Sequence, residues 1–111
     1  MNWSISYFND SVQQEIFSFP NSLKARYIHL TNLMLIDGAN LGMPYTKAMG
    51  NGLFELRLQG KDCIGRVMYC TLVNQQIVML HSFIKKTQKT PKHDLNIAIE
   101  RMNEVKRHVK P

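Results

Sequence analysis

Three runs of strand-forming residues follow one another closely in this chain, and the shortness of their connections restricts the fold more than any other feature. The runs are residues 53–58, 64–73 and 76–84. A crossover between parallel strands needs about a dozen residues or more. The connectors, 59–63 and 74–75, are far shorter. The three runs are therefore predicted to form an antiparallel meander.

Before the meander, the sequence predicts a first strand and a short helix. Residues 3–8 alternate bulky and small polar side chains, which is typical of a half-buried strand. Asp10 and Gln13 have the spacing of a capping box, so a short helix is expected to begin there. Pro20 bounds that helix.

A second, longer helix completes a predicted helical hairpin. Asn21 or Ser22 is expected to cap its start, and Asp37-Gly38 is expected to stop it. Residues 38–52, rich in Gly and Asn, are expected to form a loop. The helix has one apolar stripe, formed by Leu23, Tyr27, Leu30 and Met34.

A last helix is predicted after the meander, with Thr90-Pro91 as its cap and first turn. Residues 1–111 thus predict a single α+β domain: N-terminal strand, helical hairpin, three-stranded antiparallel meander and C-terminal helix. Because the open face of the meander is expected to be polar, the helices are predicted to pack on one sheet face. The stripe of the last helix consists of Leu95, Ala98, Ile99, Met102, Val105 and Val109.

Composition and charge narrow the function classes. The chain has 111 residues, of which 44% are hydrophobic, and a formal charge of +6. Residues 1–60 have no net charge, so the whole excess lies in residues 61–111. A local excess of this kind attracts polyanions such as nucleic acid, and it also suits a solvated basic face that keeps a protein soluble.

Several chemistries have no local support. The chain lacks a P-loop, a GxGxxG turn, a GxSxG elbow and an HExxH motif. Cys63 and Cys70 are not spaced as metal ligands and fit free thiols of a reducing cytoplasm. No apolar run approaches the roughly 20 residues of a membrane helix. We expect a cytoplasmic protein with no cofactor, no metal and no membrane partner.

One constellation of charged residues points to RNA cleavage. Glu55 and Arg57 project from one strand of the meander, and Arg66 lies on the next. Lys85 and Lys86 follow the third strand. Cations of this kind bind a scissile phosphate and stabilise its transition state, while a base takes the 2′-hydroxyl proton. The alternative is an exposed strand face with Glu–Arg pairs of little energetic value.

Other residues are candidate RNA contacts. An aromatic ring on a basic sheet face can stack an unpaired base, so Tyr69 and Phe83 either do this or pack in the core. The candidates for RNA binding are Lys47, Tyr69, Lys89, Lys92 and His93.

Three segments are distinctive: LFELR at 53–57, RVMY at 66–69 and LHSFIKKTQKTP at 80–91. Together they resemble the phage-derived HigB-like toxins of the RelE/ParE superfamily, which belong to type II toxin–antitoxin systems. The resemblance implies a RelE/ParE-like fold and a toxin that cuts mRNA on the ribosome. It also implies a cognate antitoxin, usually a helix-turn-helix protein.

The resemblance further implies roles for single residues. The basic positions that serve RNA cleavage in this superfamily correspond to Arg57, Arg66, Lys85 and Lys86. RelE relatives often have a lysine in place of Glu55, and a terminal tyrosine where this chain has Lys92 and His93. These departures leave the general acid and base open among three candidates, which are His81, Glu55 and His93.

Three functions follow as hypotheses. The first is a ribosome-dependent mRNA endoribonuclease that inhibits translation by metal-independent 2′-hydroxyl transesterification. The second is a ParE-like toxin that poisons DNA gyrase. The third is a non-catalytic regulatory remnant.

Overall fold

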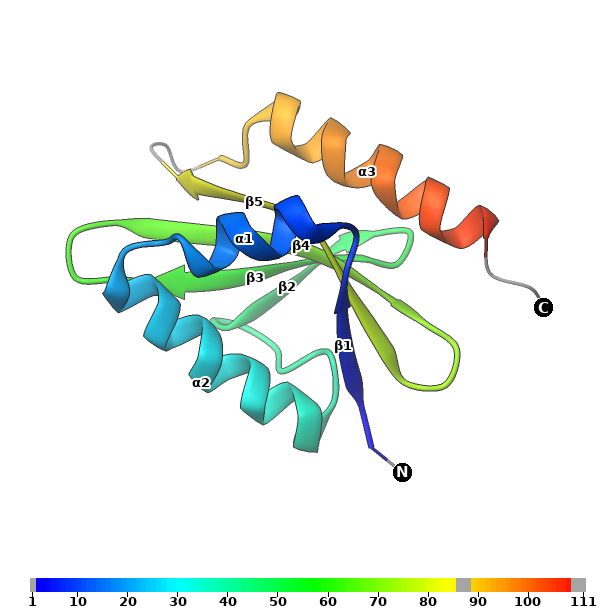
Figure 1. Cartoon of the computed structure of the whole chain (residues 1–111), viewed down its shortest axis with the longest axis horizontal. Coiled ribbons are helices and arrows are strands. Elements are labelled where there is room, and N and C mark those ends of the chain that lie inside the picture. The colour runs from blue at the N-terminus through cyan, green and yellow to red at the C-terminus, as the bar shows by residue number, and fades with distance from the viewer. Residues whose placement is uncertain (1, 86–88, 109–111) are drawn as a thin grey trace.

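The computed structural model describes residues 2–85 and 89–108, and within them the chain forms one five-stranded sheet with helices on both sides (Figure 1). The elements are β1 (Ser4–Tyr7), α1 (Asp10–Phe17), α2 (Asn21–Asp37), β2 (Thr46–Gly50), β3 (Leu53–Gln59), β4 (Ile64–Leu72), β5 (Gln76–Lys85) and α3 (Lys92–Arg107). The strand order is β1-β5-β4-β3-β2. Only β1 and β5 are parallel, and all other neighbours are antiparallel.

The predicted α+β order and the antiparallel meander are confirmed, with one strand more than expected. The prediction that residues 38–52 form a loop is wrong for β2, which pairs with β3. Two of the glycines belong to the β2–β3 turn, where Gly50, Asn51 and Gly52 all have positive φ angles. Glycine adopts this conformation without steric cost, so the turn is tight and brings β2 back onto β3.

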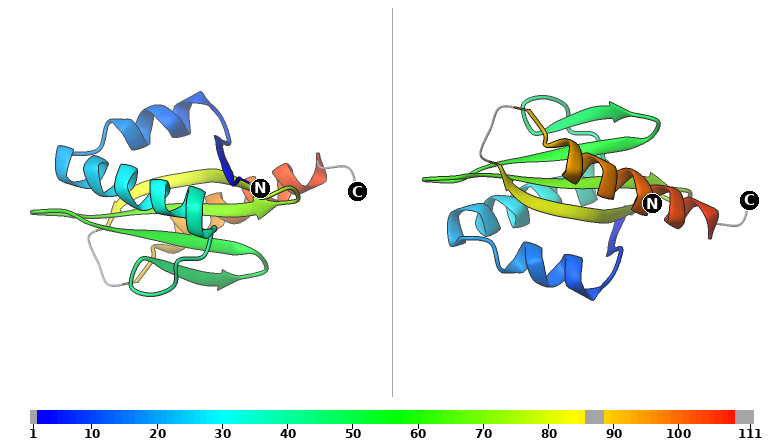
Figure 2. Two further views of the ribbon diagram at one scale, coloured as in Figure 1. Left: turned by 90° about the horizontal axis from the view of Figure 1, so that it is seen from below. Right: turned by 90° about the horizontal axis from the view of Figure 1, so that it is seen from above.

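The prediction that all helices pack on one sheet face is also wrong. Seen from below, α2 lies in front of the strands and α3 behind them, and seen from above α3 lies in front (Figure 2). Alternating strand residues form two separate cores, because successive side chains point to opposite faces. The core under α1 and α2 includes Leu56, Leu58, Val67, Tyr69, Ile77 and Met79. The core under α3 includes Leu53, Met68, Cys70, Val78 and Leu80, with Ala98 and Met102 of the helix.

The α2 stripe is buried as predicted, and its first member fixes the helix closely to the sheet. Leu23 is fully buried. A β-carbon added to Gly60 would lie 2.7 Å from Leu23 Cδ2, and one added to Gly65 would lie 3.0 Å from Leu23 Cδ1. These two glycines in and beside the β3–β4 connection therefore allow the start of α2 to approach the backbone.

The helix starts differ from the predicted caps. Asn9, not Asp10, caps α1 by accepting a hydrogen bond from the Val12 N–H at 2.9 Å. The start of α2 has no side-chain cap hydrogen bond, and the Ser22 hydroxyl instead accepts from Lys61 N–H. Side chains that suit a cap are thus diverted where another backbone donor lies within reach.

The described part of the last helix ends before the last residue of the predicted apolar stripe. Ala98 and Met102 are buried, whereas Ile99 is 37% exposed at the edge of the contact. Val109 and Lys86 lie outside the described residues. Of the helices in residues 2–85 and 89–108, none has the length and apolar character needed to cross a membrane.

Candidate active site

The face of the sheet that carries α3 is divided into an apolar half and a charged half. The helix covers the apolar half, as described above. On the same face, Arg57 lies directly opposite Arg66, and Arg66 lies opposite Phe83 on β5. Lys47 on β2 lies opposite Glu55. The strand register therefore brings charged residues from three strands together beside α3.

Glu55 is the centre of this group, and it is buried rather than open. The residue is 1% exposed, which corrects the prediction of a polar, open strand face around it. Its Oε1 lies 3.4 Å from Arg66 Nε and 3.5 Å from Arg57 NH1. The Arg66 contact has ion-pair distance but not hydrogen-bond geometry. Both carboxylate oxygens are nonetheless engaged, because the Thr90 hydroxyl donates to Oε2 at 2.5 Å.

Arg66 and Lys85 show the electrostatic cost of this crowding. Burial lowers the pKa of Arg66, and the nearby Arg57 lowers it further against the opposing effect of Glu55. The pKa of Lys85 is lowered by burial first and then by Arg66, while Glu55 raises it and Arg57 and Lys47 lower it. One carboxylate thus faces several cations. An excess of positive charge in a partly buried site favours the binding of an anion such as phosphate.

His81 is held beside this cluster by the start of α3. Its Nε2 lies 2.6 Å from Asp94 Oδ1, an ion pair when the ring is protonated. Its ring stacks on Phe83, with 5.9 Å between centroids. The other ring nitrogen, Nδ1, is buried and has no hydrogen-bond partner in the part of the chain that the structure describes. An imidazole oriented by a carboxylate is the usual arrangement of a histidine that transfers protons.

The predicted basic contacts after β5 lie at the rim. Lys89, Lys92 and His93 are exposed near the start of α3. Thr90, which the sequence indicated as a helix cap, instead anchors this segment to Glu55. The predicted catalytic Lys86 lies outside the described residues.

Tyr69 is removed from the candidate RNA contacts by its position. It is fully buried on the opposite face of the sheet, under α1 and α2. The ring stacks on Phe54 at 5.4 Å, and its hydroxyl donates to the Ala39 carbonyl at 2.5 Å. No ring face is left for a base. Phe83 is half-buried and packs against the α3 core and His81.

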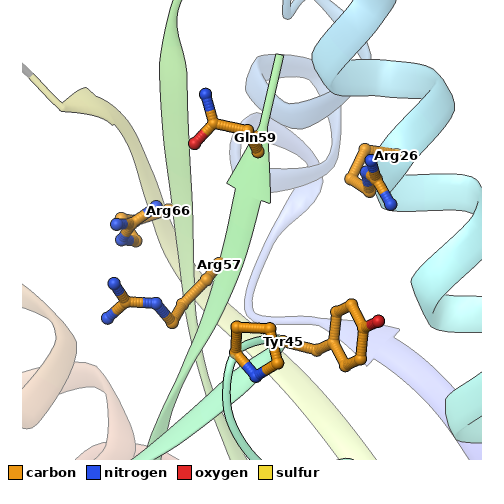
Figure 3. A pocket seen from close by; sticks show the side chains of 6 residues that line it. Arg26, Tyr45, Arg57, Gln59 and Arg66 are labelled. Atoms are coloured by element: carbon orange, nitrogen blue, oxygen red, sulfur yellow. The ribbon is translucent and has the colours of Figure 1, made fainter.

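A hollow of about 320 Å³ adjoins the charged half at the edge of β3 (Figure 3). Figure 3 shows the guanidinium groups of Arg57 and Arg66 side by side, with Tyr45 and Arg26 on the side of β3 toward α2. The lining residues are Arg26, Pro44, Tyr45, Arg57, Gln59 and Arg66. The two predicted catalytic arginines therefore open onto a hollow that sequence reasoning did not anticipate.

The sequence matches the family of phage-derived Gp49-like proteins (DUF891) over residues 14–103. This chain belongs to that family. The matched segment includes every residue of the charged cluster and hollow described above, from Arg26 to Asp94. No match is found among curated proteins.

The fold of this chain is similar to that of RelE. The chain is similar to a solved structure described as the archaeal RelE–RelB complex from Pyrococcus horikoshii OT3, with a TM-score of 0.51 and 15% sequence identity. The match covers 76% of this chain and 96% of that one. The predicted RelE/ParE-like architecture of this Gp49-like protein is therefore confirmed at the level of the fold.

Five residues of the site were missed by sequence reasoning: Arg26, Tyr45, Gln59, Thr90 and Asp94. Asp94 has a usable signal, since an acidic residue in the first turn of a helix lies near whatever that turn contacts. Arg26 has none, because it belongs to α2 and reaches the site only through tertiary packing. Among the described residues, no group of three or more His, Cys, Asp or Glu is placed to hold a metal ion.

Proposed function

We propose that this Gp49-like protein is a toxin of a type II toxin–antitoxin system that cleaves mRNA on translating ribosomes. The observation that carries the proposal is the cluster of Arg57, Arg66 and Lys85 around the single buried carboxylate of Glu55. This cluster has the charge and the partial burial that a phosphate in a cleavage reaction requires. The RelE-like fold and the segments that resemble HigB-like toxins agree with it.

The proposed reaction is a transesterification that needs no metal. The RNA 2′-oxygen attacks the adjacent phosphorus, and the bond from phosphorus to the 5′-oxygen of the next nucleotide breaks. The products are a 2′,3′-cyclic phosphate and a 5′-hydroxyl. A base removes the 2′-hydroxyl proton, and an acid protonates the leaving 5′-oxygen.

The residues divide these tasks in our proposal. Arg57 and Arg66 bind the phosphate and stabilise its added charge, while Glu55 holds both arginines in place. Lys85, with its lowered pKa, is suited to give a proton to the leaving oxygen. His81, oriented by Asp94, is the candidate base.

An antitoxin partner completes the proposal. The similar archaeal structure is a complex of RelE with RelB, and this supports a protein inhibitor for the present chain. A helix-turn-helix antitoxin that covers the charged cluster or packs along the α1–α2 hairpin would block RNA access. The proposed substrate of the toxin is ribosome-bound mRNA, so we expect the toxin to act in the cytoplasm.

The decisive experiment compares wild type with Arg66→Ala in a reconstituted translation reaction. Removing one charge-stabilising donor typically lowers a rate by about 10²- to 10³-fold. We expect cleavage of ribosome-bound mRNA by wild type, a loss of that order in Arg66→Ala, and normal cleavage by Arg107→Ala. Arg107 is exposed on the last turn of α3 and serves as the charge-matched control.

Intact mRNA in the wild-type reaction would contradict the proposal. Gyrase-dependent DNA breaks after expression of the wild-type protein, without mRNA cleavage, would instead favour the ParE-like alternative.

A further inference from the structure

The hollow at the edge of β3 lies where the sheet lacks a neighbouring strand. β2 pairs with β3 only as far as the Thr46–Leu56 pair. Beyond it, the Arg57 N–H donates to the Tyr45 carbonyl at 2.8 Å, so this side of Arg57 faces the edge. Successive residues of a strand point their N–H and C=O groups to opposite edges, so residues two apart point to the same edge. The backbone groups of Gln59 therefore face the same edge as those of Arg57, past the start of β2. The hollow thus offers a backbone donor and acceptor next to a side-chain amide.

The charge around this hollow continues beyond the cleavage cluster. Arg26 reaches it from α2, on the opposite side of β3 from the side chains of Arg57 and Arg66 (Figure 3). A second hollow of about 500 Å³ shares Arg26 and Gln59 with the first. It adds two further nitrogen-bearing side chains, His29 and Lys61. A basic groove therefore crosses the sheet edge, and no acidic side chain is among the described residues that line either hollow.

The loop that carries Tyr45, the aromatic residue of the groove, is held in place before any ligand binds. Gly42 N–H donates to the Thr46 hydroxyl at 2.8 Å, and that hydroxyl donates to Asn40 Oδ1 at 2.9 Å. Tyr45 N–H donates to the Gly42 carbonyl at 2.9 Å. The loop is thus tied at both ends, while Tyr45 remains 43% exposed. An exposed ring on a loop held in this way, beside a basic groove, is suited to stack an unpaired base.

We propose that this groove is a nucleotide subsite next to the charged cluster of Arg57 and Arg66. In it, Tyr45 stacks a base, Gln59 hydrogen-bonds to the edge of that base, and Arg26 binds the adjoining phosphate. The RNA backbone then passes from Arg57 and Arg66 over the open edge of β3 to the surface of α2. The subsite would give the enzyme a base preference at one position beside the cut. This assignment rests on the proposed function for the position of the cut, but the RNA binding it predicts is measurable without cleavage.

The test uses RNA hexamers carrying 2′-O-methyl groups, which the proposed reaction cannot cut, and measures their affinity by fluorescence anisotropy. Loss of one base stack costs about 1–3 kcal/mol, so Tyr45→Ala should weaken binding roughly 5- to 150-fold. Tyr45→Phe keeps the ring and should stay within about twofold of wild type. Arg26→Gln should reduce the slope of log affinity against log salt by about 0.7, the value for one phosphate contact on a single strand.

Base preference and a control complete the set. Gln59→Leu should reduce the differences in affinity among hexamers of A, C, G and U, because it removes the amide that reads the base edge. Arg107→Gln, on the last turn of α3, should leave affinity and preference unchanged. Tyr45 and Arg26 are exposed, and thermal melting of each variant should match wild type.

The outcomes separate this inference from the proposed function. Wild-type affinity in both Tyr45→Ala and Arg26→Gln would overturn the subsite, even if Arg66→Ala abolishes cleavage. Equal losses in Tyr45→Phe and Tyr45→Ala would overturn base stacking. Displacement of the RNA by hexaglutamate at equal concentration would assign the groove to an acidic protein segment instead. Binding that depends on Tyr45 and Arg26, without any cleavage in the translation reaction, would support the subsite and contradict the nuclease.

Discussion

The two faces of the central sheet are built from the same strands but serve different purposes. Toward α1 and α2, the sheet residues of the core are apolar or aromatic, and the buried polar residues on this face, Thr46 and Ser82, carry no charge. Toward α3, the apolar core ends part-way along the strands, and Glu55, Arg57 and Arg66 begin. Burial of apolar area is the main source of stability. The comparison indicates that one face stabilises the fold, and our proposed chemistry belongs to the charged half of the other.

The largest effect that tests this division is a stability loss without a functional loss. Leu30 is almost fully buried in the α1–α2 core, so Leu30→Ala should lower the free energy of unfolding by about 2–5 kcal/mol. RNA cleavage per folded molecule should not change, because the charged cluster lies on the opposite face. Urea unfolding measures the first quantity, and a translation reaction at a temperature where the variant is folded measures the second.

Ile36→Ala is the matched control on the same helix. Ile36 is 78% exposed, and its loss should change the free energy of unfolding by no more than about 0.5 kcal/mol. A folded Leu30→Ala variant with normal stability, or one that loses activity while folded, would show that the two faces are not separable in this way.

Glu55→Gln tests the opposite face with an intermediate effect. The amide keeps the shape and an acceptor for Thr90 but leaves two arginines without their shared negative partner, so we expect a loss of about 1–3 kcal/mol in stability. The same change removes the negative charge of Glu55, which makes the net charge of the site more positive. It should therefore tighten the binding of uncleavable RNA at low salt. Thermal melting and anisotropy measure the two effects.

The essential result for Glu55→Gln is that stability falls while RNA affinity rises. Glu15→Gln, on the exposed surface of α1, is the control and should change neither quantity measurably. If RNA binding weakened together with stability, Glu55 would be part of the binding contact rather than the counter-charge of the arginines.

The sequence was sufficient for the elements because their signals are local. The stripe of Leu23, Tyr27, Leu30 and Met34 predicted α2, and the short connectors predicted the meander. β2 was missed because its five residues, TKAMG, end in a glycine and have no apolar alternation. The charged residues of β3 looked exposed because alternation assigns a side chain to a face but does not show what covers it.

The site was only partly predictable for a related reason. Arg57, Arg66 and Lys85 lie in consecutive strands, so their proximity followed from the meander alone. Arg26 and Lys47 come, like Arg57, from the part of the sequence with no net charge, and only the packing of α2 and β2 brings these two near the others. Charge counted along the chain therefore located the cluster but underestimated its extent.

The smallest expected effect concerns the protonation of Lys85, and it sharpens the contrast between stability and binding. Burial and the neighbouring cations lower the pKa of this lysine in the folded protein. The unfolded chain therefore holds the proton more tightly, and stability should rise as pH increases from the lowered pKa to the ordinary lysine value of about 10.4. RNA affinity should fall over the same window, because Lys85 loses its charge.

Lys85→Arg stays cationic throughout this range, so its RNA affinity should persist to higher pH than that of wild type. Anisotropy with uncleavable RNA across this alkaline range measures the shift, with Lys24→Arg on α2 as control. Identical profiles for wild type and Lys85→Arg would show that Lys85 does not contact the RNA phosphate.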